Sequence, residues 1–339
     1  GLNMLPELNQ AHVPLLEGLD APAIVINDQR DVEVQPDGDL SIDISRTILI
    51  KHESAVTRFS KVDIPYDTSS PPEVLKAVVI SPEGVKRTIG SEHWTHLNPH
   101  RDTPMFGDAR TLSMNFPGLE SGSILRYHVR TRLPKKPATL VWWDSYVLGN
   151  EVFTLSAAYS IRIDPTQDYT VTGVGLTEQP PVHQAGLVRR RWTADLVPSF
   201  AVLSRTEQAL PMIYLSSFGK WADVDDWYTK LFSPATTLGP KLQSVAQSIS
   251  TKFISTNARI AAVVEAVEDR ISYEGVEYGV GAYLPRPAES SWLRRKGDCK
   301  DMVALVVGLL HHMGIEAHPV LIRPKDTGPF MVHYPSPSQ

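Results

Sequence analysis

The sequence contains a single cysteine, Cys299, among its 339 residues. One cysteine cannot form an internal disulfide and cannot supply a multi-thiolate metal site. A disulfide-stapled fold is therefore excluded. A lone cysteine is commonly a small buried hydrophobic residue, so a chemical role for Cys299 has to be argued from its neighbours.

Long apolar runs and long runs of like charge are also missing. No stretch of about 18 apolar residues occurs, so the sequence predicts no membrane span. The nearest approach to a charge run is Arg189-Arg190-Arg191, which Trp192 ends, and we interpret it as a solvated strand edge rather than an anion site. With a formal net charge of −5, the chain lacks the basic character of a nucleic-acid binder.

Patterns typical of metal sites are absent as well. No two histidines stand at a metal-ligand spacing, and no acidic loop has the pattern of a calcium site. We therefore expect no metal and no other cofactor. The sequence shows no signal peptide and begins with Gly1 rather than methionine, as a processed chain does. A leader or anchor that had been removed would leave no trace in it.

The composition is that of a soluble globular protein, with 42% hydrophobic and 21% charged residues, and the length is natural for two domains. The first half predicts β structure, because β-branched or alternating runs recur between turn signals such as Pro36-Asp37-Gly38 and Ser81-Pro82-Glu83-Gly84. Many short strands with frequent turns indicate an antiparallel β-sandwich. The expected strands span residues 23–27, 40–50, 74–80, 110–115, 124–130, 152–163 and 169–174.

The second half changes to helical periodicity. Apolar residues recur at helical spacing over residues 242–253, 260–271 and 303–313. Asn257 is the expected N-cap of the second of these helices, and Gly314 the expected end of the third. We place the β-sandwich domain at residues 1–215 and a domain with α+β character at residues 216–339.

The residues around Cys299 are those of a helix start. Cys299 follows a glycine and falls in the first turn of the third helix, where unpaired amide N–H groups favour a thiolate, the reactive form of cysteine. The same amides could donate to an oxyanion. Asp298 is the expected N-cap, which would turn its carboxylate away from the thiol, and we expect Lys300 and Asp301 to point outward. A strand is expected to follow over residues 315–322, with Pro319 favouring a sheet edge or a bulge.

Four short motifs lie between residues 271 and 322. They are Ile271-Ser272-Tyr273, Tyr283-Leu284-Pro285-Arg286-Pro287-Ala288, Gly297-Asp298-Cys299-Lys300-Asp301 and Gly314-Ile315. Together they resemble the core of the transglutaminase-like family. The first half of the chain contains a second set, Pro36-Asp37-Gly38, Phe116-Pro117-Gly118-Leu119-Glu120 before Gly122-Ser123, and Trp142-Trp143-Asp144. This set resembles the uncharacterised β domain that often precedes such cores in bacterial proteins.

The resemblance implies a papain-like scaffold with a Cys-His-Asp triad in that chain order. It implies that Cys299 attacks a carboxamide or acyl carbonyl and that an amine or water resolves the acyl-enzyme. The fold class we expect is therefore multi-domain, with an N-terminal antiparallel β-sandwich followed by part of an α+β, transglutaminase-like core.

The family's histidine follows a Pro-Ser loop like the one that ends this chain, so we expect the histidine and the aspartate beyond Gln339, and poor turnover without them. His333 is the internal rival for the base, although it precedes that loop. His311 and His312 lie some three turns along the helix, too far from the thiol, and His318 falls in the expected strand.

Three aromatic residues, Tyr273, Trp142 and Trp143, could serve either in packing or in function. Tyr273 could donate to an oxyanion, as the family resemblance implies, although packing at the end of a helix is the commoner role. Trp142 and Trp143 are adjacent in an expected strand, so we expect at most one in the core and at most one exposed on a binding face.

Two functions from different classes follow. The first is a thiol acyl-transfer enzyme that acts on peptide amides of a peptide or protein substrate, as a cysteine peptidase, an amidase or a protein cross-linker. The second is a non-catalytic module in which the β domain binds glycan or protein and the transglutaminase-like part is a degenerate scaffold. The resemblance implies a bacterial envelope or secreted setting, with a cell-envelope partner, while a single reduced cysteine also fits cytoplasm.

Overall fold

The structure is a computed structural model that describes residues 12–98, 109–133, 141–206, 209–275, 283–323 and 330–338. Contacts between Cα atoms divide the chain into two units. The first, which we call the β unit, ends at Gly219, and the second, the helical unit, begins at Lys220.

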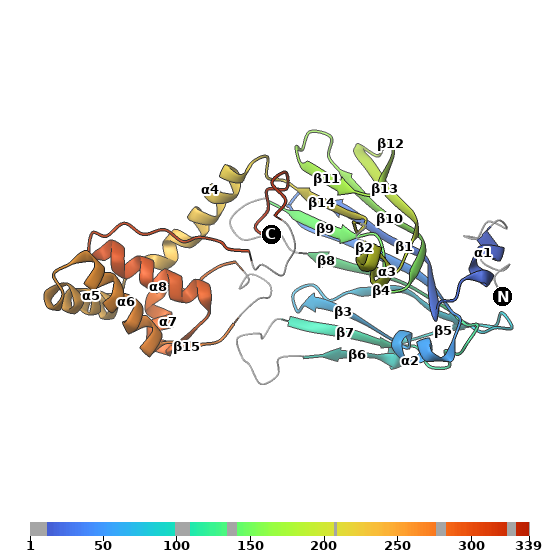
Figure 1. Ribbon diagram of the computed structural model, residues 1–339, viewed down its shortest axis with the longest axis horizontal. Helices are drawn as coiled ribbons and strands as arrows, with labels where there is room; N and C mark the ends of the chain where they lie inside the picture. Colours follow the sequence, from blue (N-terminus) through green and yellow to red (C-terminus); the bar gives the residue numbers. More distant parts are fainter. Residues whose placement is uncertain are drawn as a thin grey trace. The chain divides into compact units, whose positions relative to one another are not determined.

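A large eight-stranded sheet forms the main layer of the β unit (Figure 1). Its strand order is β12-β13-β10-β1-β2-β8-β4-β5, and every neighbouring pair is antiparallel except β1 and β10, which are parallel. The sequence predicted antiparallel pairing throughout, which is wrong for this one pair. The strands are β1 (Ala23–Val34), β2 (Leu40–Ile50), β4 (Glu73–Ile80), β5 (Lys86–Thr88), β8 (Ile124–Leu133), β10 (Phe153–Ile163), β12 (Thr177–Gln184) and β13 (Leu187–Val197).

Two three-stranded sheets complete the β unit, and each shares a hydrophobic core with the large sheet. One core joins Ile48 and Leu125 of the large sheet to Leu112 of β7. The other joins Ile161 of the large sheet to Leu215 of β14. The sheets contain β3 (Lys61–Asp67), β7 (Ala109–Asn115) and β6 (Trp94–Leu97) in one case, and β11 (Thr170–Val174), β14 (Met212–Ser216) and β9 (Trp143–Val147) in the other.

Short helices lie around the strands of the β unit, and α1 covers a third core that contains Leu16, Ile24 and Ile80. These helical segments are α1 (Val13–Gly18), η3 (Glu53–Ala55), α2 (Val56–Phe59), η4 (Ser91–His93) and α3 (Phe200–Thr206). The mixed α/β architecture, with a large antiparallel-rich sheet and several small sheets, confirms the expectation of a β-rich, multi-domain chain. The sandwich and the transglutaminase-like core stay predictions.

Both turns singled out in the sequence are hairpin turns. Gly38 adopts a φ of 87° between β1 and β2, and Gly84 adopts a φ of 88° between β4 and β5. These values lie in the left-handed region, which glycine enters without steric cost. The hairpin predictions are confirmed.

Two surface predictions for the β unit are wrong. Trp142 and Trp143 are both buried, because Trp142 packs against Tyr169, with ring centroids 5.7 Å apart, while Trp143 stacks on Phe218 at 6.0 Å. The two rings pack against different residues, and each of these contacts shields its tryptophan from solvent. The run 189–191 lies in β13, which pairs with β10 and β12, so it is not at a sheet edge.

The helical unit packs its helices around a separate core that includes Leu242, Val263, Leu305 and Leu309. Ser255, not Asn257, caps its longest helix, since its hydroxyl accepts a hydrogen bond from the Ala258 N–H. The elements are α4 (Trp221–Phe232), η6 (Ser233–Thr236), α5 (Pro240–Lys252), α6 (Thr256–Arg270), β15 (Ser272–Tyr273), α7 (Ala288–Arg294), β16 (Lys296–Gly297) and α8 (Cys299–His312).

The strand expected over residues 315–322 does not form. A strand needs a neighbouring strand for its backbone N–H and C=O groups, and no strand among the described residues pairs with this segment. Ile315 and Ala317 pack against the helical core, whereas Val320 is 76% and Ile322 83% exposed. Over the described residues, no helix is long and apolar enough to cross a membrane.

Candidate functional site

Cys299 is the first residue of α8, and its side chain is exposed. Asp298, the residue before it, is the N-cap and has extended backbone geometry. The first backbone N–H groups of a helix have no partner within the helix, so they point out of its N-terminal end toward the surface around the thiol. The sequence prediction of a helix that begins at this cysteine, capped by Asp298, is confirmed.

The carboxylates on either side of Cys299 are both occupied by backbone amides. Asp298 Oδ1 accepts hydrogen bonds from the N–H groups of Lys300 and Asp301, at 3.2 and 3.3 Å. Asp301 Oδ2 in turn accepts from the Asp298 N–H at 3.2 Å, which completes a reciprocal capping box. The Lys300 ammonium also pairs with Asp298. This arrangement turns both negative charges toward the helix end instead of leaving them free beside the thiol.

Asp301 does not point outward as expected, but is buried. Its Oδ1 accepts a hydrogen bond from the backbone N–H of Arg286 at 2.7 Å, and the Arg286 guanidinium lies 3.3 Å from its Oδ2. The loop before α7 is therefore tied to the first turn of α8. Sequence reasoning missed this role of Arg286, and the Asp-x-x-Asp spacing of a capping box was the available signal.

Gly297 brings a second segment to the cysteine. It pairs with Tyr273 across the short parallel sheet of β15 and β16, and its carbonyl accepts from the Glu274 N–H at 2.8 Å. A Cβ atom at this glycine would lie 2.9 Å from the Cβ of Asp301, closer than real Cβ contacts come. The glycine is therefore needed for strand β16 to approach the capping box.

Tyr273 lies beside the thiol, with its side chain 61% exposed. Its hydroxyl hydrogen-bonds with the Cys299 side chain and with the Cys299 backbone. The charge of a Cys299 thiolate, followed by burial and the thiol hydrogen bond, raises the pKa of Tyr273. The phenol therefore remains a protonated donor at neutral pH, next to the atoms that would react.

A second tyrosine, Tyr228, lies in α4. Its side chain is only 8% exposed. Burial, followed by the negative charges of Cys299 and Asp298, raises the pKa of Tyr228 to about 12. The sequence analysis did not select Tyr228, because nothing in the acidic, aromatic stretch around it marks one tyrosine as special.

The four histidines considered as possible bases have different surroundings in the structure. The His311 ring bonds to the Ala317 carbonyl at 2.7 Å, and the His318 ring lies 3.0 Å from Glu316 Oε1. His312 is an exposed residue at the end of α8. His333 is exposed and precedes the buried Tyr334. The role of His333 as base stays a prediction.

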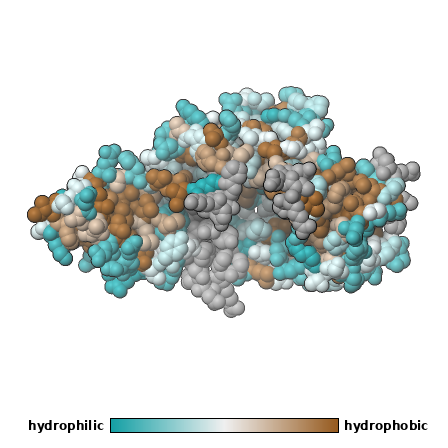
Figure 2. All heavy atoms as spheres, viewed as in Figure 1, coloured by the Kyte–Doolittle hydropathy of each residue, from teal (hydrophilic) through white to brown (hydrophobic). Residues whose placement is uncertain are grey.

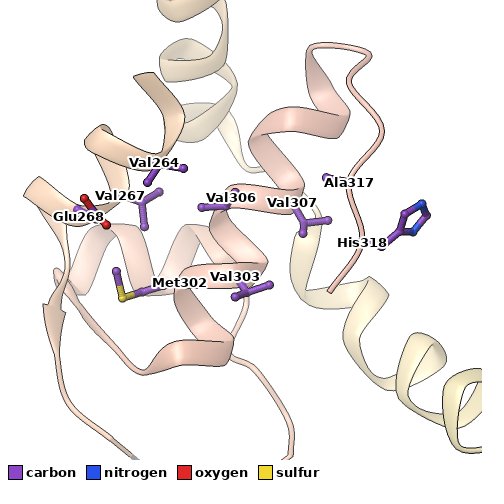
Figure 3. Close-up of a pocket in the computed structure, with 9 residues that line it drawn as sticks. All are labelled: Val264, Val267, Glu268, Met302, Val303, Val306, Val307, Ala317 and His318. Atoms are coloured by element: carbon purple, nitrogen blue, oxygen red, sulfur yellow. The ribbon is translucent and has the colours of Figure 1, made fainter. Parts of the chain in front are cut away.

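An apolar pocket of about 260 Å³ lies between α6 and α8 (Figure 3). Val303 and Val306 of α8 face it, and Val264 faces it from α6. Glu268 and His318 are the ionisable residues of its lining. Figure 2 shows hydrophobic residues gathered on the visible surface of the helical unit, at left. No group of three His, Cys, Asp or Glu side chains able to hold a metal occurs among the described residues.

Comparison with known proteins gives a family match to part of the chain and a structural match over most of it. Residues 36–201 match the family described as "Domain of Unknown Function with solved-structure structure (DUF3857)". A crystal structure named "a putative protease" from Parabacteroides distasonis superposes with a TM-score of 0.75 at 13% identity, over 86% of this chain and 59% of that one. An M1 zinc metallopeptidase from Deinococcus radiodurans gives only 0.32 at 14% identity, over 58% and 43% of the two chains. No curated protein matches the chain.

These findings define what the chain is similar to. Residues 36–201 are similar to a domain of unknown function, and the fold is similar to that of a structure named as a putative protease. Because the identity to that structure is 13%, the likeness concerns the fold alone. The chain spans 59% of the length of that structure.

Proposed function

We propose that Cys299 is the nucleophile of a transglutaminase-like, papain-type thiol site that transfers acyl groups from peptide amides. Such a site serves a cysteine peptidase, an amidase or a protein cross-linker. We also propose that its substrate is a peptide or protein of the bacterial envelope or the secreted space. One observation carries the proposal: an exposed thiol begins a helix whose two flanking carboxylates are turned onto backbone amides.

This arrangement supports nucleophilic chemistry for a physical reason. The N-terminal end of α8 carries partial positive charge, which favours a thiolate, and capping by Asp298 and Asp301 keeps their charges directed at N–H groups. A thiolate that attacks a carbonyl creates an oxyanion, and we propose the Cys299 N–H and the Tyr273 hydroxyl, which interact with each other beside the thiol, as its donors. The fold likeness to a structure named as a protease agrees with peptide chemistry.

The proposal also includes the histidine and the aspartate of the triad, but it assigns neither role firmly to a residue of this sequence. A general base is needed to take the thiol proton, and later to protonate the leaving amine when the C–N bond breaks. We propose that a histidine supplies this function, from beyond Gln339 or, as the rival, from His333. Residual reactivity of the thiol itself does not need that base.

The experiment is alkylation of Cys299 by iodoacetamide across pH. Because the chain has one cysteine, every alkylated product reports on this residue. We expect the folded chain to react at about pH 7 several-fold faster than the urea-unfolded chain, whose thiol resembles a free cysteine with a pKa of about 8.5. Mass spectrometry measures both rates, and Cys299→Ser is the blank. Equal rates in the folded and unfolded chains, or a slower folded rate, would contradict the proposal.

A further inference from the structure

Three consecutive basic residues, Arg294, Arg295 and Lys296, lie between the end of α7 and the cysteine, and all three are exposed. Arg294 is the last residue of α7, and Arg295 is its C-cap. Lys296 is the first residue of β16, three residues before Cys299. Because the whole chain has a net charge of −5, this run is a local concentration of positive charge beside the thiol.

The carboxylates nearest to the thiol in the chain are already paired with other cations. The two carboxylates of the capping box have their own partners, Lys300 and Arg286. Glu274, which follows β15, takes the ammonium of Lys296 at 2.6 Å. The two arginines of the run have no ion pair and no hydrogen-bond acceptor for their guanidinium groups among the described residues. Two unpaired positive charges therefore remain at the edge of the thiol site.

Arg295 keeps its side chain at a backbone position that favours glycine. Its φ of 58° and ψ of 27° lie in the left-handed region, which glycine enters without the steric cost that a Cβ atom brings. Its carbonyl accepts from the Ser272 N–H at 2.9 Å, where β15 and β16 begin their pairing. The helix dipole does not account for this arginine, because Arg294 already places a cation in the last turn of α7. A strained position that retains a long cationic side chain indicates a use for that side chain.

The two arginines lie within reach of a peptide bound at the thiol. Arg295 precedes Cys299 by four residues, so the chain between them spans at most about 14 Å. An extended peptide advances about 3.4 Å per residue, so four of its residues cover that whole distance. The length of an arginine side chain brings the charge closer still. A substrate side chain two to four residues from the reacting carbonyl is therefore the one that meets these charges.

We propose that Arg294 and Arg295 select peptide substrates with a carboxylate side chain two to four residues from the amide that Cys299 attacks. This inference rests on the proposed function. A guanidinium group offers paired N–H donors that match the two oxygens of a carboxylate, which glutamate and aspartate supply in a peptide. The arginines act on selection of the substrate and take no part in the bond changes at the thiol.

The test uses chloroacetyl peptides, which alkylate a thiol without a general base. The Cys299 thiolate forms a bond to the CH₂ carbon, and chloride leaves with the electron pair of the C–Cl bond. The two probes are chloroacetyl-Ala-Ala-Glu-Ala amide and the same peptide with Gln in place of Glu, so they differ in one carboxylate. At low salt we expect the wild-type chain to react about 3-fold faster with the Glu peptide, in the range of an exposed ion pair. The preference should shrink toward 1 at about 0.5 M salt, and mass spectrometry measures each rate.

The variants separate charge from structure. The double variant Arg294→Gln, Arg295→Gln should lose the preference for the Glu peptide, whereas Arg295→Lys should keep most of it. Arg295→Gly should weaken the preference without lowering the melting temperature, because glycine suits the left-handed position. Lys252→Gln is the matched control. It removes an exposed charge from the end of α5 opposite to the one that bonds to Glu289 of α7, and the preference should not change.

Equal rates for the two peptides with the wild-type chain would overturn the proposal, as would a preference that the double variant retains. Failure of the proposed function looks different. The Gln peptide would then alkylate the folded wild-type chain no faster than the urea-unfolded chain, whatever the effect of the carboxylate.

Discussion

At the scale of single residues, Asp301 connects the site to its surroundings. Its carboxylate accepts from two backbone N–H groups and faces a guanidinium, all while buried. The sequence identified the residue as part of a motif, but placed it on the outside of the helix. The error has a physical cause: helical periodicity describes the middle of a helix, whereas the first turn is governed by unpaired backbone donors.

Asp301→Ala should destabilise the helical unit strongly. The substitution removes the carboxylate that accepts from the N–H groups of Asp298 and Arg286 and that pairs with the partly buried Arg286 guanidinium. Each unpaired buried group costs about 1–3 kcal/mol, so we expect a loss of about 3 kcal/mol or more. Urea unfolding followed by tryptophan fluorescence measures it, because Trp221, Trp227 and Trp292 lie in this unit.

Asp301→Asn is the control for that measurement. The amide keeps one oxygen acceptor in nearly the same shape while losing the charge, so its effect should fall between those of wild type and Asp301→Ala. An Asp301→Ala chain as stable as wild type would mean that the capping box contributes nothing to the helical unit.

At the scale of elements, the sequence predicted helix ends correctly but did not predict which strands pair. The helix start at Asp298 and the end at Gly314 were correct, because caps depend on one or two residues. The strand over residues 315–322 was wrong, because a strand requires a partner that periodicity does not reveal. The two-residue strands β15 and β16 were missed, since pairs this short have no pattern to recognise.

Gly297→Ala should distort the contact between β16 and α8. The added Cβ would lie 2.9 Å from the Cβ of Asp301, and β16 cannot easily move away because Gly297 pairs with Tyr273 of β15. Overpacking of this kind costs about 1–3 kcal/mol. We expect a lower melting temperature for the helical unit and a loss of the folded chain's faster alkylation, measured by calorimetry and by the iodoacetamide rate.

Gly18→Ala serves as the comparison for Gly297→Ala. A Cβ at Gly18, the last residue of α1, would have no atom within 4 Å, so neither the melting temperature nor the alkylation rate should fall. If both glycine variants behave alike, the close approach at Gly297 is not what shapes the thiol site.

At the scale of the whole molecule, composition and the change from β to helical pattern indicated two parts. The structure divides at Gly219 and Lys220, four residues after the expected end of the first domain at residue 215. What the sequence could not show is how the first part is layered. The pairing of β1 with β10, far apart in the chain, is set by tertiary packing and not by any local signal.

The β unit should fold without the helical unit. Among the described residues, the hydrophobic clusters of the β unit draw only on residues up to Leu215, and that of the helical unit starts at Leu238, so neither unit needs the other to complete these cores. A chain that ends at Gly219 should therefore unfold in one cooperative transition. Its melting temperature should match that of the β unit within the full chain, as measured by calorimetry and near-ultraviolet circular dichroism of the buried Trp142, Trp143 and Trp192. A shortened chain with no near-ultraviolet signal would show instead that the β unit depends on residues after Gly219, and the two parts would then be one folding unit.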